Sequence, residues 1–431
     1  MRCGAAGIIG GMTTASAASF RRVIAAEVVS NFGSMMSRLA IPWLAVLMLG
    51  ATPWQMGLLA VADVLAAAVA ALALGVAIDR RPKRAVMVAA DIARTALLGL
   101  LALAAAGGSM SFVALLGAAA AGGVLGMAFE LARSAWIAQA APADELSRRN
   151  AQLAAGGAIS EAAAFAITGA VFQWIGGIAV LAVDALSYLV SAALLRRVDE
   201  PAHAVAADGV VAAEAGEPVS PRATTSLSEA LRLLLRHTSL RTLAMLDGLV
   251  ALAMGVASSC YMIFVSRELA LSTAVLGVVF ALGGAGSALG AAVAPRTGRR
   301  IGSGQALAWG LVAAAIGSAF IPLASGAGLA AIGLLAAHQL IGDAGLVSHH
   351  IHDRTMRQTL VPADALARVD GAMRTLDQAA VVAGALGGGA FATAYGARPG
   401  MWLSTALLGV AALVALASFR RTPAAASRSI A

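Results

Sequence analysis

Apolar stretches of about 20 residues recur along the whole chain, separated by short charged or glycine- and proline-rich patches. A helix of that length crosses the hydrocarbon of a bilayer. Because lipid offers no partner to free backbone groups, and the sequence lacks the alternating pattern of a barrel, each stretch is predicted to be a helix. Charged residues make up only 12% of the chain, against about 25% in soluble domains. The sequence therefore predicts an all-α integral membrane protein.

Twelve transmembrane helices are predicted, and lysines and arginines crowd the connections after the even-numbered ones. Positive charge marks the cytoplasmic side, so we expect a multi-pass protein of the inner (cytoplasmic) membrane with both termini in the cytoplasm. The net charge of +8 is then a topological signal and does not indicate a nucleic-acid partner. The first twenty residues are expected to be a cytoplasmic tail rather than a signal peptide. The helices are predicted to begin near residues 20, 53, 84, 109, 147, 177, 240, 271, 302, 327, 364 and 399.

One phrase occurs twice in the chain. PADELSRRN at 142–150 is repeated as PADALARVD at 362–370. We call the difference in residue number between Pro142 and Pro362 the repeat offset. Between the copies, residues 198–225 are rich in Ala, Gly, Pro and Glu without a hydrophobic period, which predicts a cytoplasmic linker. It would separate two six-helix bundles, 1–197 and 226–431. An even number of spans returns the chain to its starting side, so the two halves are predicted to be parallel repeats.

Four polar residues near the start of the chain share one helical face. Glu27, Asn31, Ser34 and Arg38 follow spacings of four, three and four, which place them on one side of a helix with 3.6 residues per turn. An ionisable group at the bilayer centre costs about 2.5–3.5 kcal/mol, so such a stripe is expected to face a cavity.

Glu27 has an acidic counterpart one repeat offset later, Asp247. We expect the two carboxyl groups to approach each other across the axis that relates the halves. A carboxylate removed from water binds a proton more readily, which suits a proton-coupled carrier. The alternative is that Glu27 pairs with Arg21 and Asp247 with Arg241, as interfacial ion pairs.

The basic connection after the second helix carries a recognisable motif. GVAIDRRPKR, Gly75 to Arg84, resembles the signature loop of the major facilitator superfamily, and GAAVAPRTGRR from Gly290 resembles its second copy without the acid. The phrases that begin at Pro142 and Pro362 resemble the branch with bacterial siderophore and drug exporters. This resemblance covers the whole chain. It implies a transporter in which helices 1, 4, 7 and 10 line a central cavity.

The motif also implies a gate at the cytoplasmic end. Asp79 would form an ion-pair cluster with Glu130 or Arg133 that locks this end in one state of an alternating-access cycle. The alternative is that the basic residues only determine topology. The predicted gate comprises Gly75, Asp79, Arg80, Arg84, Glu130 and Arg133.

Two further pairs of charged residues are expected to be structural, and four single acids are given no role. Asp91 with Arg94, and Arg374 with Asp377, are three residues apart and expected to neutralise each other on one helix face. Four single acids could line the transport path, but their depth is not fixed by the sequence: Asp63, Glu161, Asp184 and Asp343.

A histidine run at the end of the tenth helix reads HHIHD. His349, His350, His352 and Asp353 lack the spacing of a helical i, i+4 pair and have no cysteine beside them. The run is therefore predicted to be a solvated loop, and no metal site or other cofactor is predicted.

The function that follows is secondary transport. No nucleophile–base set or ATP-binding loop occurs, so we expect neither an enzyme nor an ATP-driven pump. Aromatic residues make up only 5% of the chain, which favours an apolar cavity and an amphipathic or lipophilic cargo. The prediction is a monomeric exporter of such a compound, with protons as the coupling ion. An importer is one alternative, because Ala164-Phe165 stands where antiporters of this superfamily carry a Gly-Pro pair. A receptor or scaffold without transport activity is another.

Overall fold

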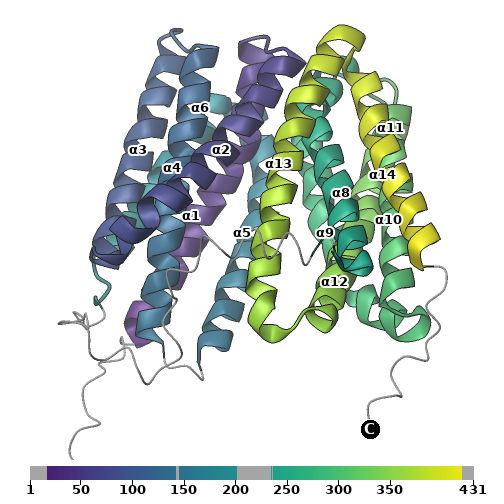
Figure 1. Ribbon diagram of the computed structural model, residues 1–431. Coiled ribbons are helices and arrows are strands. Elements are labelled where there is room, and N and C mark those ends of the chain that lie inside the picture. Colours follow the sequence, from purple (N-terminus) through teal and green to yellow (C-terminus); the bar gives the residue numbers. More distant parts are fainter. Residues whose placement is uncertain (1–16, 142–144, 201–233, 235, 420–431) are drawn as a thin grey trace, which may run out of the picture.

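The protein is described by a computed structural model over residues 17–141, 145–200, 234 and 236–419 (Figure 1). Within these ranges every regular element is helical. Most of the predicted linker, from residue 201 onward, lies outside them. The elements are α1 Ala17–Trp43, η1 Leu44–Met48, α2 Pro53–Asp79, α3 Lys83–Ala106, α4 Phe112–Ala140, α5 Leu146–Ile175, α6 Gly177–Leu195, α8 Thr238–Ile263, η2 Phe264–Glu268, α9 Thr273–Ile301, α10 Ser303–Leu323, α11 Leu329–Ala337, η3 His338–Gly342, α12 Asp343–Leu360, α13 Ala363–Tyr395 and α14 Ala397–Phe419.

The twelve predicted helices are confirmed, and each predicted start lies within three residues of the observed one. The elements η1, η2 and η3 are single π-helical turns, and α11, η3 and α12 form one span, Leu329–Leu360. Ten helices of the described chain are long and apolar enough to cross a membrane. The other two spans are α1, which carries the polar stripe, and α13.

The helices form two groups, which we call the first half (α1–α6) and the second half (α8–α14) (Figure 1). In the first, α6 packs on α1 and α3, and α4 packs on α2 and α3. In the second, α8 packs on α13 and α14, and α10 packs on α12 and α14. The halves meet where α5 contacts α9 and where α2 contacts α13 and α8.

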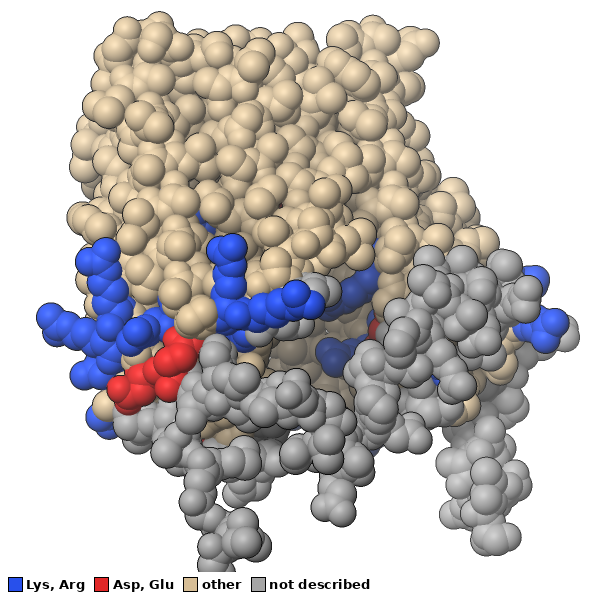
Figure 2. All heavy atoms as spheres, turned by 60° about the vertical axis from the view of Figure 1, so that its left-hand side comes forward, with Lys and Arg blue, Asp and Glu red and all other residues tan. Residues whose placement is uncertain are grey.

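The two ends of the molecule differ in charge. Figure 2 shows Lys and Arg side chains in a band across the lower part of the molecule, where α1 begins and α14 ends, while the upper surface in this view carries none. We call these the basic end and the far end. The expectation that the basic end lies in the cytoplasm depends on this difference in charge.

The backbone repeats its irregularities at the repeat offset. The π-helical turns that follow α1 and α8 begin at Leu44 and Phe264. Gly176 and Gly396, which end α5 and α13, have φ of +95° and +100°. Gly50 has φ of +64°, and its counterpart Ala270 has φ of +51°. Both halves therefore turn their chain in the same way at the same places.

Ala270→Gly should stabilise the protein by up to about 1 kcal/mol. A side chain in the left-handed region costs about 1–2 kcal/mol, and the greater freedom of glycine in the unfolded chain offsets part of the gain. Gly50 shows that the same turn accommodates glycine. Thermal unfolding in detergent measures the effect. The control is Ala292→Gly, an exposed position inside α9, where glycine should lower the melting temperature instead.

Candidate functional site

The polar stripe of α1 meets α4 through one ion pair inside the first half. Arg133 Nη1 donates to Glu27 Oε1 at 2.6 Å, and the two side chains are 14% and 18% exposed. Arg133 also pairs with Glu130, one turn earlier on α4, which is 52% exposed. Glu27 thus has a cationic partner, but it is Arg133 rather than Arg21. The pair joins a predicted coupling residue to a predicted gate residue.

The rest of the stripe divides between structural contacts and open surface. Asn31 Nδ2 donates to the Gly157 carbonyl on α5 at 3.1 Å, and the Ser34 hydroxyl lies 2.8 Å from the Tyr188 hydroxyl on α6. Arg38 is exposed. Asn31 and Ser34 therefore hold α1 against its neighbours, which differs from the expectation that the whole stripe faces a cavity.

A second polar group lies beside the stripe, between α3 and α6. Asp91 pairs with Arg94 at 3.6 Å, as their spacing predicts. The Arg94 guanidinium lies over the rings of Phe129 and Tyr188, at 5.4 and 5.0 Å from their centroids. The sequence did not indicate these cation–π contacts, because they join three helices whose relative rotation a linear pattern does not contain.

The four acids of unassigned depth occupy different environments. Asp184 on α6 is 1% exposed and accepts a hydrogen bond from the Ser187 hydroxyl at 3.2 Å. Asp63 on α2 and Glu161 on α5 are exposed. Asp343 is half-buried, at the start of α12, where its carboxylate lies against Gly283 of α9.

At the basic end, Arg84 alone of the predicted gate residues has a described contact with the segment that follows α6. The Glu200 carboxylate accepts from the backbone N–H groups of Lys83 at 2.5 Å and Arg84 at 3.0 Å, at the start of α3. The Arg84 guanidinium donates to the Val198 carbonyl at 3.1 Å. Arg80 is exposed, and the Asp79 side chain lies outside the described part. The predicted lock through Asp79 therefore stays a prediction, while Glu130 and Arg133 pair with each other.

In the second half, Asp247 of α8 pairs with His349 of α12. Oδ1 of Asp247 and Nε2 of His349 are 3.0 Å apart, and the side chains are 7% and 0% exposed. Asp247 therefore has a partner in its own half, as Glu27 does, and in the described chain no hydrogen bond or ion pair joins the two acids to each other. The proposed alternative partner, Arg241, is exposed.

The expectation of a solvated loop at the histidine run is wrong. His349, His352 and Asp353 lie within α12 and are buried. Arg357 holds Asp353 at 2.6 Å and Asp370 of α13 at 2.9 Å. The charged residues lower the hydropathy of this segment, and low hydropathy suggested that the helix ends here. In the structure the helix continues, and these side chains are buried.

The expected pair of Arg374 with Asp377 is also not formed. Arg374 is exposed, and no ion pair of the described residues joins it to Asp377. The spacing of three permits such a pair but does not require it.

A cavity of about 250 Å³ lies among the helices of the second half. Tyr261, Phe280 and Met401 line it together with the polar side chains of His338 and Gln339. The Phe280 ring also lies 6.2 Å from Phe165 of α5, centroid to centroid, so the cavity borders the contact between the halves. Its lining is mainly apolar with a few polar groups, as in many small-molecule sites.

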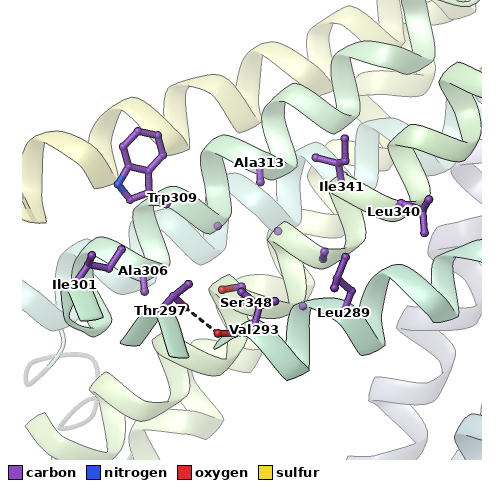
Figure 3. A pocket seen from close by; sticks show the side chains of 14 residues that line it. Leu289, Val293, Thr297, Ile301, Ala306, Trp309, Ala313, Leu340, Ile341 and Ser348 are labelled. Carbon is purple, nitrogen blue, oxygen red and sulfur yellow. Dashed lines mark hydrogen bonds between the residues drawn. The ribbon is translucent and has the colours of Figure 1, made fainter. Parts of the chain in front are cut away.

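A larger recess of about 340 Å³ opens on the outer side of the second half, between α9, α10 and α12 (Figure 3). Trp309, Val293 and Leu289 line it and are exposed large apolar side chains. On a membrane-spanning bundle such side chains face lipid. We therefore do not treat this recess as part of the route of the cargo.

All four hydrogen bonds between the halves in the described chain lie at the far end. Two of them are Trp54 N–H to Thr393 Oγ1 at 3.1 Å and Thr273 Oγ1 to the Gly169 carbonyl at 3.2 Å. The others are Ala274 N–H to Gln173 and Arg267 to the Val46 carbonyl. Among the described residues, hydrogen bonds therefore join the halves at the far end and at no other place.

Comparison with known proteins gives consistent matches. The family described as Major Facilitator Superfamily matches residues 23–358. The uncharacterized MFS-type transporter YfiS of Bacillus subtilis (strain 168) is 27% identical over 414 residues, 91% of each chain. The nucleoside transporter NupG matches with a TM-score of 0.74 at 13% identity, over 94% of this chain and 100% of its own.

A bacterial homologue of the iron transporter ferroportin also matches, at 15% identity over 93% of this chain and 98% of its own. The TM-score is 0.71 for its inward-facing state and 0.55 for its outward-facing state, which covers 94% of this chain and 100% of that one at 16% identity. At these identities the structures show the fold alone.

Proposed function

This chain belongs to the Major Facilitator Superfamily, and we propose that it exports a small amphipathic or lipophilic compound from the cytoplasm in exchange for protons. The observation that carries the proposal is the Glu27–Arg133 ion pair inside the first half. The protein would work as a monomer in the inner membrane, with its basic end in the cytoplasm.

The ion pair can couple proton binding to a change of shape. While Glu27 is ionised, its carboxylate holds Arg133 at 2.6 Å and so ties α1 to α4. Protonation of Glu27 would remove the charge that holds the guanidinium, and Arg133 would keep only its more exposed partner Glu130. A ligand shifts a conformational equilibrium only through a difference in binding to the two states. Making or breaking this pair supplies such a difference for the proton.

Asp247 and His349 would form a second protonation-dependent contact, in the second half. Asp247 stands one repeat offset after Glu27 and also contacts an ionisable partner on another helix. Each half would therefore carry one titratable link between two of its helices, α1 with α4 and α8 with α12. Asn31 and Arg38 belong to the proposed coupling group only through the helical face that they share with Glu27, since Asn31 bonds to α5 and Arg38 is exposed.

The arrangement of contacts suits a carrier that is open at the basic end. The halves are joined by hydrogen bonds at the far end, and the cavity lined by Tyr261 and Phe280 lies next to this junction. Cargo would enter from the basic side and meet mainly apolar side chains. Asp79, Gly75, Arg80 and Arg84 would close that side in the opposite state, which remains a proposal from the motif.

Accumulation of dyes, antibiotics and siderophores in an efflux-deficient bacterial host tests the direction. We expect cells with the protein to accumulate less of at least one compound than cells with the empty vector, and a protonophore to remove the difference. Higher accumulation in the expressing cells would support the importer instead. Equal accumulation across the panel, with the protein present in the membrane, would count against export of this class of compound.

A further inference from the structure

Three potential metal ligands converge in the second half. One ligand atom each from Asp247 on α8 and from His349 and His350 on α12 lie within 4.8 Å of one another. Asp247 Oδ1 and His349 Nε2 are 3.0 Å apart. His349 is buried and His350 is exposed, so the group has an inner face and an accessible one.

The donor types fit a first-row divalent cation. Imidazole nitrogen and carboxylate oxygen are the ligands of Zn²⁺ and of non-haem Fe²⁺, and two histidines with one carboxylate leave positions open for water. With metal–ligand bonds of about 2.0–2.1 Å, neighbouring ligand atoms lie about 3 Å apart. The Asp247–His349 separation matches that value. The exposed His350 ring can close the remaining gap by rotation about its side-chain bonds.

Charge around Asp247 also favours a cation. Asp247 has no arginine or lysine ion-pair partner in the described chain. Asp377 lies within electrostatic range of both Asp247 and Arg357 and forms no ion pair with a described residue. The nearby guanidinium of Arg357 is engaged by Asp353 and Asp370. Uncompensated carboxylates inside a membrane protein are costly, and a divalent cation would neutralise this excess.

The His349 ring has a further free position. Its Nδ1 atom is buried and has no hydrogen-bond partner among the described residues. The hydrogen bond of the ring among the described residues is therefore the one between Nε2 and Asp247. The neighbouring His352 is different, because its Nε2 lies 3.4 Å from Thr297 Oγ1 and its ring packs against Gly298, away from the group.

We propose that Asp247, His349 and His350 bind one first-row divalent cation such as Zn²⁺. Asp247 and His349 form the buried part of the site, and His350 with water molecules completes it from the accessible side. The site shares Asp247 and His349 with the proposed titratable link of the second half, so a cation and a proton would compete for this pair. Cation binding itself depends neither on export nor on the proton link at Glu27.

Zn²⁺ titration by calorimetry, on purified full-length protein with its affinity tag removed, tests the site. We expect one Zn²⁺ per chain, and at least about tenfold weaker binding in Asp247→Asn, His349→Gln and His350→Gln. His352→Gln, the matched control, should bind as the wild type does. Co²⁺ should give a visible d–d absorption in the wild type and the control that His350→Gln loses.

His350→Gln is the decisive variant because the side chain is exposed and its loss should leave the fold intact, which a thermal melt verifies. Absence of saturable Zn²⁺ binding by the wild type would overturn the proposal. So would unchanged affinity in all three ligand variants, or an equal loss in His352→Gln.

Discussion

Glu27→Gln should reduce pH-gradient-driven transport to the level of vesicles without protein and leave substrate binding unchanged. Glutamine keeps the size of the side chain and a hydrogen-bond acceptor for Arg133, but it has no titratable carboxyl group. The variant is therefore fixed in one charge state, and the Arg133 contact no longer responds to protons. Transport into proteoliposomes with an imposed pH gradient, beside equilibrium binding of the same compound, measures both quantities.

Glu130→Gln is the matched control for this experiment. Glu130 contacts the same guanidinium but is 52% exposed, and exposed ion pairs contribute about 0–1 kcal/mol. We expect its transport to keep responding to the pH gradient, because Glu27 remains titratable, even where loss of a predicted gate contact lowers the rate. Breaking a fully buried pair costs about 3–5 kcal/mol, and Glu27→Gln should cost less because Arg133 keeps Glu130. Gradient-driven transport by Glu27→Gln at the wild-type rate would exclude Glu27 as the coupling residue.

Gly169→Leu should abolish transport by preventing closure of the far end. Gly169 on α5 and Gly277 on α9 are in backbone contact, and a side chain at Gly169 would overlap the Thr273 carbonyl and Gly277 itself. Small residues allow such approach between membrane helices. A leucine would push α5 from α9 and break the Thr273 hydrogen bond to the Gly169 carbonyl. The population should shift away from the state with the closed far end.

Labelling of a single cysteine at Phe280 by a membrane-impermeant maleimide reports that shift. Phe280 lies beside the α5–α9 junction, and the native Cys3 and Cys260 would be replaced by alanine. We expect labelling from the far side to accelerate in Gly169→Leu. Gly117→Leu is the control, since Gly117 on α4 is exposed and has open space where a side chain would stand. Unchanged labelling and transport in Gly169→Leu would show that the α5–α9 contact does not gate the protein.

The helices were predictable because their signal is local. Hydropathy over about 20 residues marks each span, and PADELSRRN with its copy marked the repeat that the π-helical turns at Leu44 and Phe264 now display in the backbone. The repeat offset also paired Glu27 with Asp247 before any contact was known. Each of these inferences used order along the chain and nothing else.

The partners of those acids were not predictable in the same way. Arg133 meets Glu27 and His349 meets Asp247 because of how α4 and α12 are rotated against α1 and α8, and rotation depends on all neighbouring helices. The prediction of a solvated loop at the histidine run was wrong for a related reason. A charged segment suggests a solvated end, whereas His349 and Asp353 are buried against charged partners from adjacent helices or turns.

Proton movement driven by the cargo itself tests the central claim most directly. A pH-sensitive dye inside proteoliposomes, with no imposed gradient, would follow protons when a compound from the accumulation panel is added on one side. We predict a pH change that requires both the compound and the wild-type protein and that Glu27→Gln does not produce. Transport of the compound without any accompanying proton movement would contradict proton-coupled exchange.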